Sequence, residues 1–181
     1  MKIIPYVHIG REYSISDYGV ISIFEKMQNH NLVRVVFSGG EIRTPEQFLK
    51  FFKNTRNVIH IMVEDGECVL LSWLNRWGHN HAFCHFCMFP EIWGKRTIEV
   101  AKISLEYLFS FESDGKPLLD VILSRTSAKN KLVNKFAERM GFHHVGVIPG
   151  IMKDFYTDSN QDAVFKYIKR EDVLCEKYTP M

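Results

Sequence analysis

Apolar side chains recur at helical spacing in four stretches of this chain. Ser14 or Ser16 is placed to cap the first stretch, and the second begins at Thr44, where Pro45 suits the first turn of a helix. The spacing predicts helices over residues 16–29, 45–52, 97–111 and 131–140.

The segments between these helices are rich in β-branched and aromatic residues, which favour strands. They predict strands over residues 2–8, 32–37, 58–63, 68–74, 82–89, 119–123, 144–148 and 163–168. The pair Asp65-Gly66 predicts a hairpin between the third and fourth of these strands, and Pro90 ends the fifth. Apart from the first strands, the predicted order is two helices, a three-strand meander, a helix, a strand, a helix and two strands.

The composition agrees with a single folded domain over residues 1–181. A hydrophobic content of 46% with 13% aromatic residues excludes a disordered chain, and a net charge of +2 is too small to indicate nucleic-acid binding. No apolar run approaches the roughly 20 residues of a membrane helix, and we expect neither a signal peptide nor a membrane partner. Four cysteines without a regular framework are typical of the reducing cytoplasm, where we expect this protein.

The most specific motif begins at Asn130. An apolar helical face follows it, and Gly141 stands where the residue after a helix needs a positive φ. The segment resembles the N-x-x-[AS]-x-x-[LF]-[YA]-E-[KR]-x-G-F motif of the GCN5-related N-acetyltransferases. The matching residues are Asn130, Glu138, Arg139, Gly141 and Phe142.

This resemblance implies an α/β fold with a mixed, mostly antiparallel sheet that splays between its fourth and fifth strands and carries helices on both faces. It also implies an acyltransferase that moves the acetyl group of acetyl-CoA to a primary amine by direct attack. The acceptor would be a small molecule or a peptide, and the state of association, including a homodimer, is left open. The alternative is a catalytically inactive module that keeps the fold for binding or interaction.

In this family coenzyme A binds through a strand–loop–helix unit, commonly V-x-P-x-x-R-G-x-G-x-G/A. Unpaired N–H groups and the positive end of the helix dipole suit the pyrophosphate. Pro90 and Gly94 match this pattern, whereas three other residues replace its defining positions: Trp93, Arg96 and Ile98. The cofactor contacts implied by the resemblance are Met88, Phe89, Trp93, Gly94, Lys95, Arg96, Thr97, Ile98 and Asn130.

Two interpretations of the altered loop are open. In the first, Lys95 and Arg96 add charge-assisted contacts to the phosphates, and the backbone cradle survives without the second glycine. In the second, Arg96 blocks or bends the loop, and the chain no longer binds the cofactor.

The resemblance assigns the oxyanion donor to a backbone N–H near Met88. The tyrosine that often serves as acid is replaced by Ala137, and a glutamate of some members is replaced by Arg125. Histidine titrates near neutrality, so His85 is our candidate for the general base. The competing interpretation of His85 is a packed or solvent-facing strand residue, and weaker candidates are Glu64 and Tyr107.

Two further clusters have less specific interpretations. Cys84-x-x-Cys87 has metal-ligand spacing, but in a regular strand His81, His85 and Cys87 would share one face and Cys84 the other, so we expect no metal site. A basic stretch can face the adenosine phosphate of the cofactor or nucleic acid, or it can be a solvated helix face. It consists of Arg125, Lys129, Lys131, Lys135 and Arg139.

Overall fold

The computed structural model describes residues 1–9, 12–94 and 96–174, which form two compact units. Among the described residues, the first unit contains those within 1–75, 85–93 and 153–160, and the second contains those within 76–84, 94–152 and 161–174. The predicted single domain over residues 1–181 stays a prediction, and the two units are described separately below.

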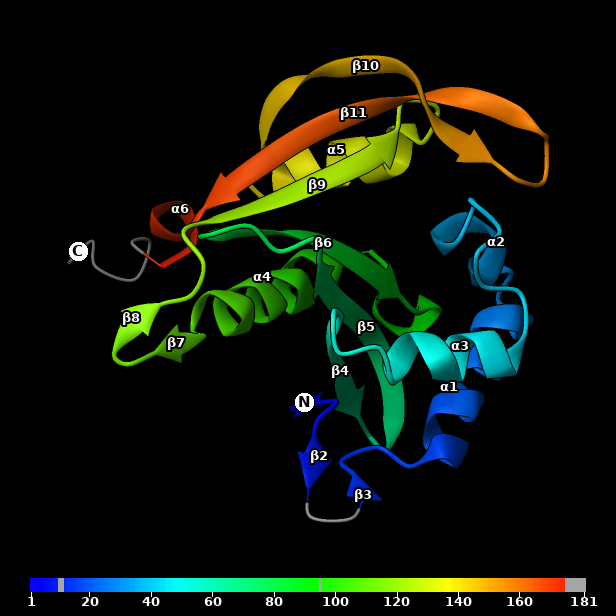
Figure 1. The fold of residues 1–181 in the computed structure, drawn as a ribbon, viewed down its shortest axis with the longest axis vertical. Coiled ribbons are helices and arrows are strands. Elements are labelled where there is room, and N and C mark those ends of the chain that lie inside the picture. The colour runs from blue at the N-terminus through cyan, green and yellow to red at the C-terminus, as the bar shows by residue number, and fades with distance from the viewer. Residues whose placement is uncertain (10–11, 95, 175–181) are drawn as a thin grey trace. The chain divides into compact units, whose positions relative to one another are not determined.

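The strands of the main sheet follow the order β1-β4-β5-β6-β9-β11-β10 (Figure 1). Neighbouring strands pair antiparallel in β1–β4, β4–β5 and β9–β11, whereas β6 and β9 run parallel. The parallel pairing covers only three positions, from His81 opposite Val121 to Phe83 opposite Leu123. This mixed sheet, in which the fourth and fifth strands pair only briefly, confirms the predicted fold class. The strands are β1 (Lys2–Pro5), β4 (Val58–Glu64), β5 (Glu67–Asn75), β6 (His81–Met88), β9 (Val121–Ser127), β10 (His143–Asp154) and β11 (Ser159–Lys169).

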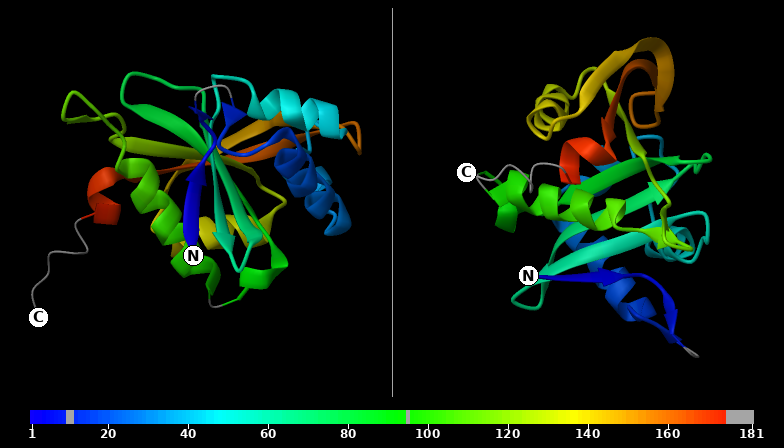
Figure 2. Two further views of the ribbon diagram at one scale, coloured as in Figure 1. Left: turned by 90° about the horizontal axis from the view of Figure 1, so that it is seen from below. Right: turned by 90° about the vertical axis from the view of Figure 1, so that its left-hand side faces the viewer.

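Two helices of the first unit begin at the caps that the sequence predicts. The side chain of Ser16 accepts a hydrogen bond at the start of α1 (Asp17–Asn29). Thr44 and Gln47 form a capping box at the start of α3 (Pro45–Phe52). Figure 2 shows α1 and α3 side by side. Their buried apolar residues form one core with β4 and β5, which includes Phe24, Met27, Phe48, Phe52, Ile59, Leu71 and Trp73.

The prediction of a strand over residues 32–37 is wrong, because this segment forms the helix α2 (Leu32–Val36). The N–H of Phe37 donates to the carbonyl oxygen of Val33, as helical backbone requires, and Val33 is buried in the core. Asn31 precedes the helix in the left-handed conformation, with φ of 56°. The β-branched residues favour a strand only weakly, and packing of one helical face on the core outweighs that preference.

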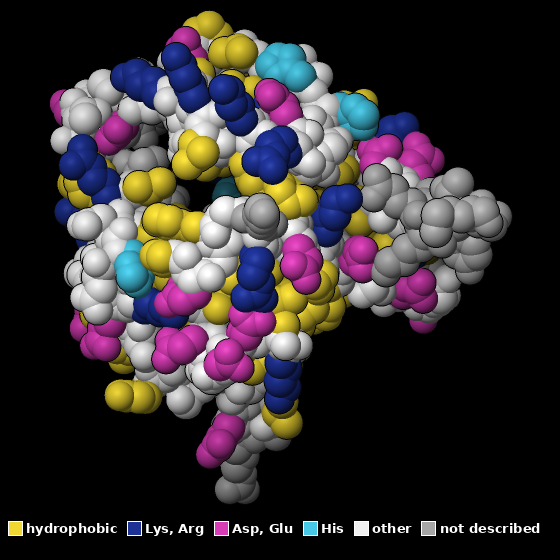
Figure 3. Space-filling view, turned by 180° about the vertical axis from the view of Figure 1, so that it is seen from behind, with side chains coloured by type: hydrophobic (Ala, Val, Ile, Leu, Met, Phe, Trp, Pro, Cys, Tyr) yellow, Lys and Arg dark blue, Asp and Glu magenta, His cyan; other side chains and the backbone are white. Residues whose placement is uncertain are grey.

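In the second unit, α4 (Arg96–Phe109) and α5 (Lys131–Arg139) are the long helices. Lys131, Lys135 and Arg139 are exposed and lie four residues apart, so they share one face of α5. Figure 3 shows Lys and Arg side chains gathered in the region of this helix. This part of the predicted basic stretch is therefore a solvated helix face.

The remaining elements are short, and apart from His8, which lies in the strand predicted over residues 2–8, they were not predicted. They are β2 (His8–Ile9), β3 (Glu12–Tyr13), the 3₁₀ helix η1 (Pro90–Ile92), β7 (Glu112–Ser113), β8 (Lys116–Pro117) and α6 (Arg170–Leu174). Within the described ranges, no helix has the length and apolar character needed to cross a membrane.

Candidate active site

His85 lies in the second half of β6 and contacts two residues near the end of β5. Its ring is parallel to that of Trp73, with 4.8 Å between centroids and an interplanar angle of 5°. Its Nε2 atom is 3.1 Å from Oδ1 of Asn75. His85 is half-buried, so it is neither a fully packed core residue nor a freely solvated one.

The two cysteines of β6 are buried, and neither of them is part of a disulfide. Burial raises the pKa of Cys87 to about 12, which makes its thiolate inaccessible near neutral pH. Up to Cys84 the strand alternates buried and half-buried residues, and then His85 and Phe86 are both half-buried. The regular alternation that we expected along β6 is therefore broken at this point.

His81 does not lie in the same compact unit as His85. Its imidazole covers Gly78 so closely that a Cβ on that glycine would lie 2.1 Å from the ring. Among the described residues, no three His, Cys, Asp or Glu side chains are grouped to hold a metal ion.

The end of β6 is fastened by a side chain from the following loop. The indole Nε1 of Trp93 donates to the carbonyl oxygen of Met88 at 3.0 Å, although the Trp93 side chain remains 57% exposed. Pro90 ends the strand as predicted and opens η1, in which the Trp93 N–H donates to the Pro90 carbonyl oxygen. Trp93 therefore has a definite structural role at a position where the family motif has a different residue.

The backbone before α4 has the open glycine conformation that an anion cradle needs. Gly94 has a φ of +93°, and a Cβ built on it meets no atom within 4 Å. Thr97 N–H donates back to the Gly94 carbonyl oxygen at 3.4 Å, and the helix starts at Arg96, whose side chain is exposed. Thr97 and Ile98 are half-buried. Lys95 lies outside the described residues.

Asn130 is the N-cap of α5. Its Oδ1 atom accepts a hydrogen bond from Val133 N–H at 3.2 Å. Gly141 has a φ of +89°, as expected for the residue that follows this helix. Both ends of the motif therefore have the local structure that their residue types predict.

Ala137 and Glu138 differ in their surroundings. Ala137 is 8% exposed and carries no hydroxyl group for proton transfer. Glu138 accepts a hydrogen bond of 2.8 Å from Lys166, a lysine of β11 that is only 2% exposed and also donates to the Asn134 carbonyl oxygen. The hydrogen bond from Lys166 lowers the pKa of Glu138. The glutamate of the motif thus neutralises a buried cation and is not a free acid.

The other candidates for proton transfer are poorly suited. Glu64 lies at the hairpin end of β4–β5, where its partner across the two strands is Glu67. Asn75, which contacts His85, ends β5 eight residues after Glu67, at a distance of about 26 Å along the strand. Burial raises the pKa of Tyr107, whose ring packs edge-on against Phe111 at 5.1 Å.

Solved structures share this architecture over most of the chain. The spermidine N-acetyltransferase from Vibrio cholerae, in complex with CoA and spermine, has a TM-score of 0.71 and 14% identity, and covers 95% of this chain and 98% of that one. The microcin C7 self-immunity acetyltransferase, in complex with acetyl-CoA and AMP, has a TM-score of 0.68, 13% identity and coverage of 86% and 89%. The ribosomal-protein-S5-alanine acetyltransferase from Vibrio fischeri has a TM-score of 0.66, 12% identity and coverage of 88% and 92%.

The chain has the fold of the GCN5-related N-acetyltransferases. By sequence, it matches no protein-family profile and no curated protein. The resemblance that begins at Asn130 and ends at Phe142 is therefore confirmed at the level of the acetyltransferase fold.

Within this acetyltransferase fold, the partners of His85 were missed from the sequence. Trp73 and Asn75 stand two residues apart on β5, and such spacing places both on one face of a strand. Nothing in the linear sequence sets the register that brings them to His85 on the next strand. Lys166 was missed for the same reason, because its partner Glu138 lies 28 residues away.

Proposed function

We propose that this chain is an acetyl-CoA-dependent N-acetyltransferase that acetylates a primary amine of a small molecule or peptide by direct attack. The observation that carries the proposal is the strand–loop–helix unit after β6. It combines a strand ended by Pro90, an open left-handed Gly94 and a helix that starts at Arg96. Of the three solved structures with this fold, one contains CoA and one contains acetyl-CoA, and all three are named acetyltransferases. These names support the same ligand class.

The residues of the loop fit a phosphate group. The N–H groups that begin α4 provide donors, Gly94 leaves the backbone uncovered, and Arg96 adds a cation. We assign the pyrophosphate of coenzyme A to Gly94, Lys95, Arg96, Thr97 and Ile98. Asn130 is the proposed additional contact, and the strand-end residues Met88, Phe89 and Trp93 are assigned to the pantetheine side.

Acetyl-CoA supplies an activated acyl thioester, and the chain must supply proton transfer and charge stabilisation. His85 is the proposed general base that removes a proton from the ammonium form of the acceptor. The backbone N–H of Met88 is the proposed donor to the developing oxyanion. Because Ala137 offers no acid, we assign protonation of the departing thiolate to water.

The second candidate is an inactive module with the same fold. Two observations favour it: Trp93 is hydrogen-bonded to Met88 within the altered loop, and Ala137 stands where many family members have a tyrosine. A module of this kind would bind coenzyme A or a partner without turnover.

A thiol-release assay separates the two functions. Acetyl-CoA is incubated with the chain and a panel containing a polyamine, a peptide with a free N-terminus and an aminoacyl nucleotide analogue, and acetylated products are identified by mass spectrometry. The enzyme hypothesis predicts amine-dependent release that falls on the order of 10²-fold in His85→Ala. Binding of acetyl-CoA without release for any amine class would favour the inactive module.

A further inference from the structure

We propose that Lys26 of α1 is a positioning residue that holds the end of β6 and the turn η1 in place. It thereby orients Met88, Phe89 and Trp93. The inference rests on the proposed function, which assigns these three residues to the pantetheine side of coenzyme A. It adds a residue of α1, a helix to which the proposed function assigns no role.

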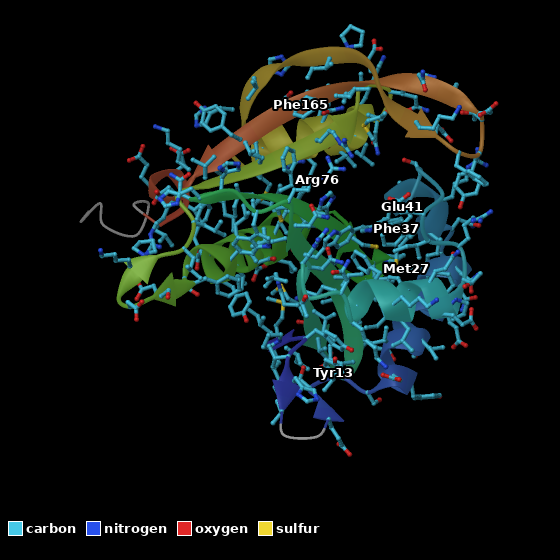
Figure 4. All side chains as sticks on the ribbon, in the orientation of Figure 1. Tyr13, Met27, Phe37, Glu41, Arg76 and Phe165 are labelled. Atoms are coloured by element: carbon cyan, nitrogen blue, oxygen red, sulfur yellow. The ribbon has the colours of Figure 1, made fainter. Side chains whose placement is uncertain are left out.

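The first step of the argument is the set of contacts made by the Lys26 ammonium. Its Nζ atom lies 2.8 Å from a carboxylate oxygen of Glu91 in η1. It also donates to Oε2 of Glu67, at the start of β5, at 3.0 Å and to the Cys68 carbonyl oxygen at 2.9 Å. An ammonium has three N–H donors, which matches these three acceptors. Figure 4 labels the next residue of α1, Met27, which is buried in the core of the first unit. Lys26 therefore joins α1 to β5 and η1.

The second step concerns Phe89, the residue that follows β6. Its ring centroid lies 4.9 Å from Nζ of Lys26, and the side chain of Phe89 is fully buried. Its backbone N–H donates to the carbonyl oxygen of Val69 in β5 at 3.0 Å. A cation is attracted more strongly to an aromatic face when water is excluded, and the Lys26 side chain is only 16% exposed. Phe89 is thus fixed through its ring and its backbone, and all of these residues lie in the first compact unit.

The third step concerns η1, a single 3₁₀ turn of three residues. Ile92 N–H donates to the Phe89 carbonyl oxygen at 3.2 Å, and Trp93 N–H donates to a carbonyl oxygen of the turn at 3.1 Å. Such 3₁₀ bonds have poorer geometry than the bonds of an α-helix. Burial of Ile92 anchors the turn, but apolar burial has no preferred direction. The ion pair between the ammonium and η1 supplies a directional contact from outside the turn.

The fourth step is the energy of this ion pair. Burial favours the neutral amine, yet the hydrogen bonds to Glu91 and Glu67 outweigh this effect and raise the pKa of Lys26. The hydrogen bond from Lys26 in turn lowers the pKa of Glu91, so both groups are charged near neutral pH. The side chains of Glu67 and Glu91 are 68% and 42% exposed, so they stay hydrated if the ammonium is removed. Ion pairs of this kind add little to the free energy of unfolding, and the effect of Lys26 is therefore a local one on η1.

The direct test is hydrogen exchange of the Ile92 and Trp93 amides in the chain without ligand. Lys26→Met keeps most of the aliphatic stem and removes the ammonium, and it should speed exchange at both amides on the order of 10-fold or more. The Phe48 amide, which donates to the Thr44 carbonyl oxygen in α3, should exchange as in the wild type. Unchanged exchange at η1, or equal acceleration at Phe48, would overturn the proposal.

A second variant and a matched control complete this experiment. Glu91→Ala removes the same ion pair from an exposed side chain, and it should also speed exchange in η1. Lys53→Met is the control, because Lys53 likewise pairs with a carboxylate, that of Asp17 at 2.7 Å, and lies over a ring, that of Tyr13 at 5.9 Å. Neither of these partners belongs to β6 or η1. Faster exchange of η1 in the control would show a general effect of losing an ion pair, and it would also overturn the proposal.

The binding arm tests the consequence for the cofactor. The dissociation constant of acetyl-CoA, measured by calorimetry, should rise on the order of 5-fold or more in Lys26→Met and Glu91→Ala, because η1 then occupies its binding position only part of the time. Lys53→Met should bind acetyl-CoA as the wild type does. Equal affinity in the wild type and Lys26→Met, despite faster exchange at η1, would refute the role of Lys26 in cofactor binding. Failure of the wild type to bind acetyl-CoA would instead refute the proposed function, while the exchange result would still decide whether Lys26 holds η1.

Discussion

The ring of Phe155 lies against the backbone of Gly40, where a side chain would collide with it. A Cβ on Gly40 would be 2.4 Å from Cγ of Phe155, and the Phe155 N–H donates to the Ser38 carbonyl oxygen at 2.8 Å. Arg43 stacks on the same ring at 4.7 Å. The tip of the β10–β11 hairpin is therefore seated on the segment between α2 and α3, within the first compact unit.

The close contact between Gly40 and Phe155 predicts unequal effects of two glycine substitutions. Gly40 and Gly66 have φ of +76° and +84°, but only Gly40 is obstructed, because nothing lies within 4 Å of a Cβ on Gly66. Gly66→Ala should cost about 1 kcal/mol of unfolding free energy from backbone strain, and Gly40→Ala should cost about 1–3 kcal/mol more from the collision. Urea unfolding measures both values. In a Phe155→Ala background the extra cost should disappear, and its persistence there would rule out Phe155 as its cause.

A second prediction concerns His60, which is 1% exposed in β4. Burial lowers its pKa from 6.5 to about 4, so the unfolded chain binds a proton between these values and the folded chain does not. The free energy of unfolding should therefore fall as the pH drops from 6.5 to about 4, by up to about 3 kcal/mol from this residue. His60→Gln should flatten that dependence. An unchanged pH dependence in His60→Gln would contradict the assignment.

The sequence predicted the elements whose signals are local. Ser16, Thr44 and Asn130 cap helices through side-chain contacts with backbone three residues away, and Asp65-Gly66 makes its turn within four residues. The helix α2 was mistaken for a strand because its packing partners lie outside its own segment. Long-range packing decides such short apolar stretches, and residue preference does not.

The residue types of the candidate site could be predicted from the sequence, but the contacts of these residues could not. His85 could be selected because histidine suits a general base, yet its contacts depend on the register of β5 against β6. Similarly, Glu138 could be matched to a motif, but the sequence did not indicate that it forms an ion pair with the buried Lys166 of β11. The alternation of buried and half-buried residues along β6 breaks after Cys84, and the composition of the strand did not indicate this break either.

A third prediction separates two roles of Asn130. The cap is observed, and Asn130→Ala should lower stability by about 1 kcal/mol, whereas Asn130→Asp keeps an acceptor for Val133 N–H. If Asn130 also contacts coenzyme A, the aspartate should weaken acetyl-CoA binding, because a carboxylate cannot donate and repels phosphate. Thermal unfolding and calorimetry of the two variants measure these effects. Equal affinity in the wild type and Asn130→Asp would restrict the residue to its structural role.

A fourth prediction concerns the missing acid. Ala137→Tyr introduces the hydroxyl found in many family members, and Ala137→Phe adds nearly the same bulk without it. Because the position is 8% exposed, both should lose stability by about 1–3 kcal/mol. We expect equal kcat values, because in the proposed mechanism water protonates the thiolate. A Tyr variant that turns over at least 10-fold faster than the Phe variant would show that an acid was limiting.

Binding of acetyl-CoA at the start of α4 is the most direct test of the central claim. Calorimetric titration should give one site per chain, with affinity reduced in Arg96→Gly and reduced further in Arg96→Glu, because charge reversal adds repulsion to the loss of a contact. Neither variant should unfold the chain, since the Arg96 side chain is exposed. The absence of heat and of any thermal shift at millimolar acetyl-CoA would contradict the proposed acetyltransferase function.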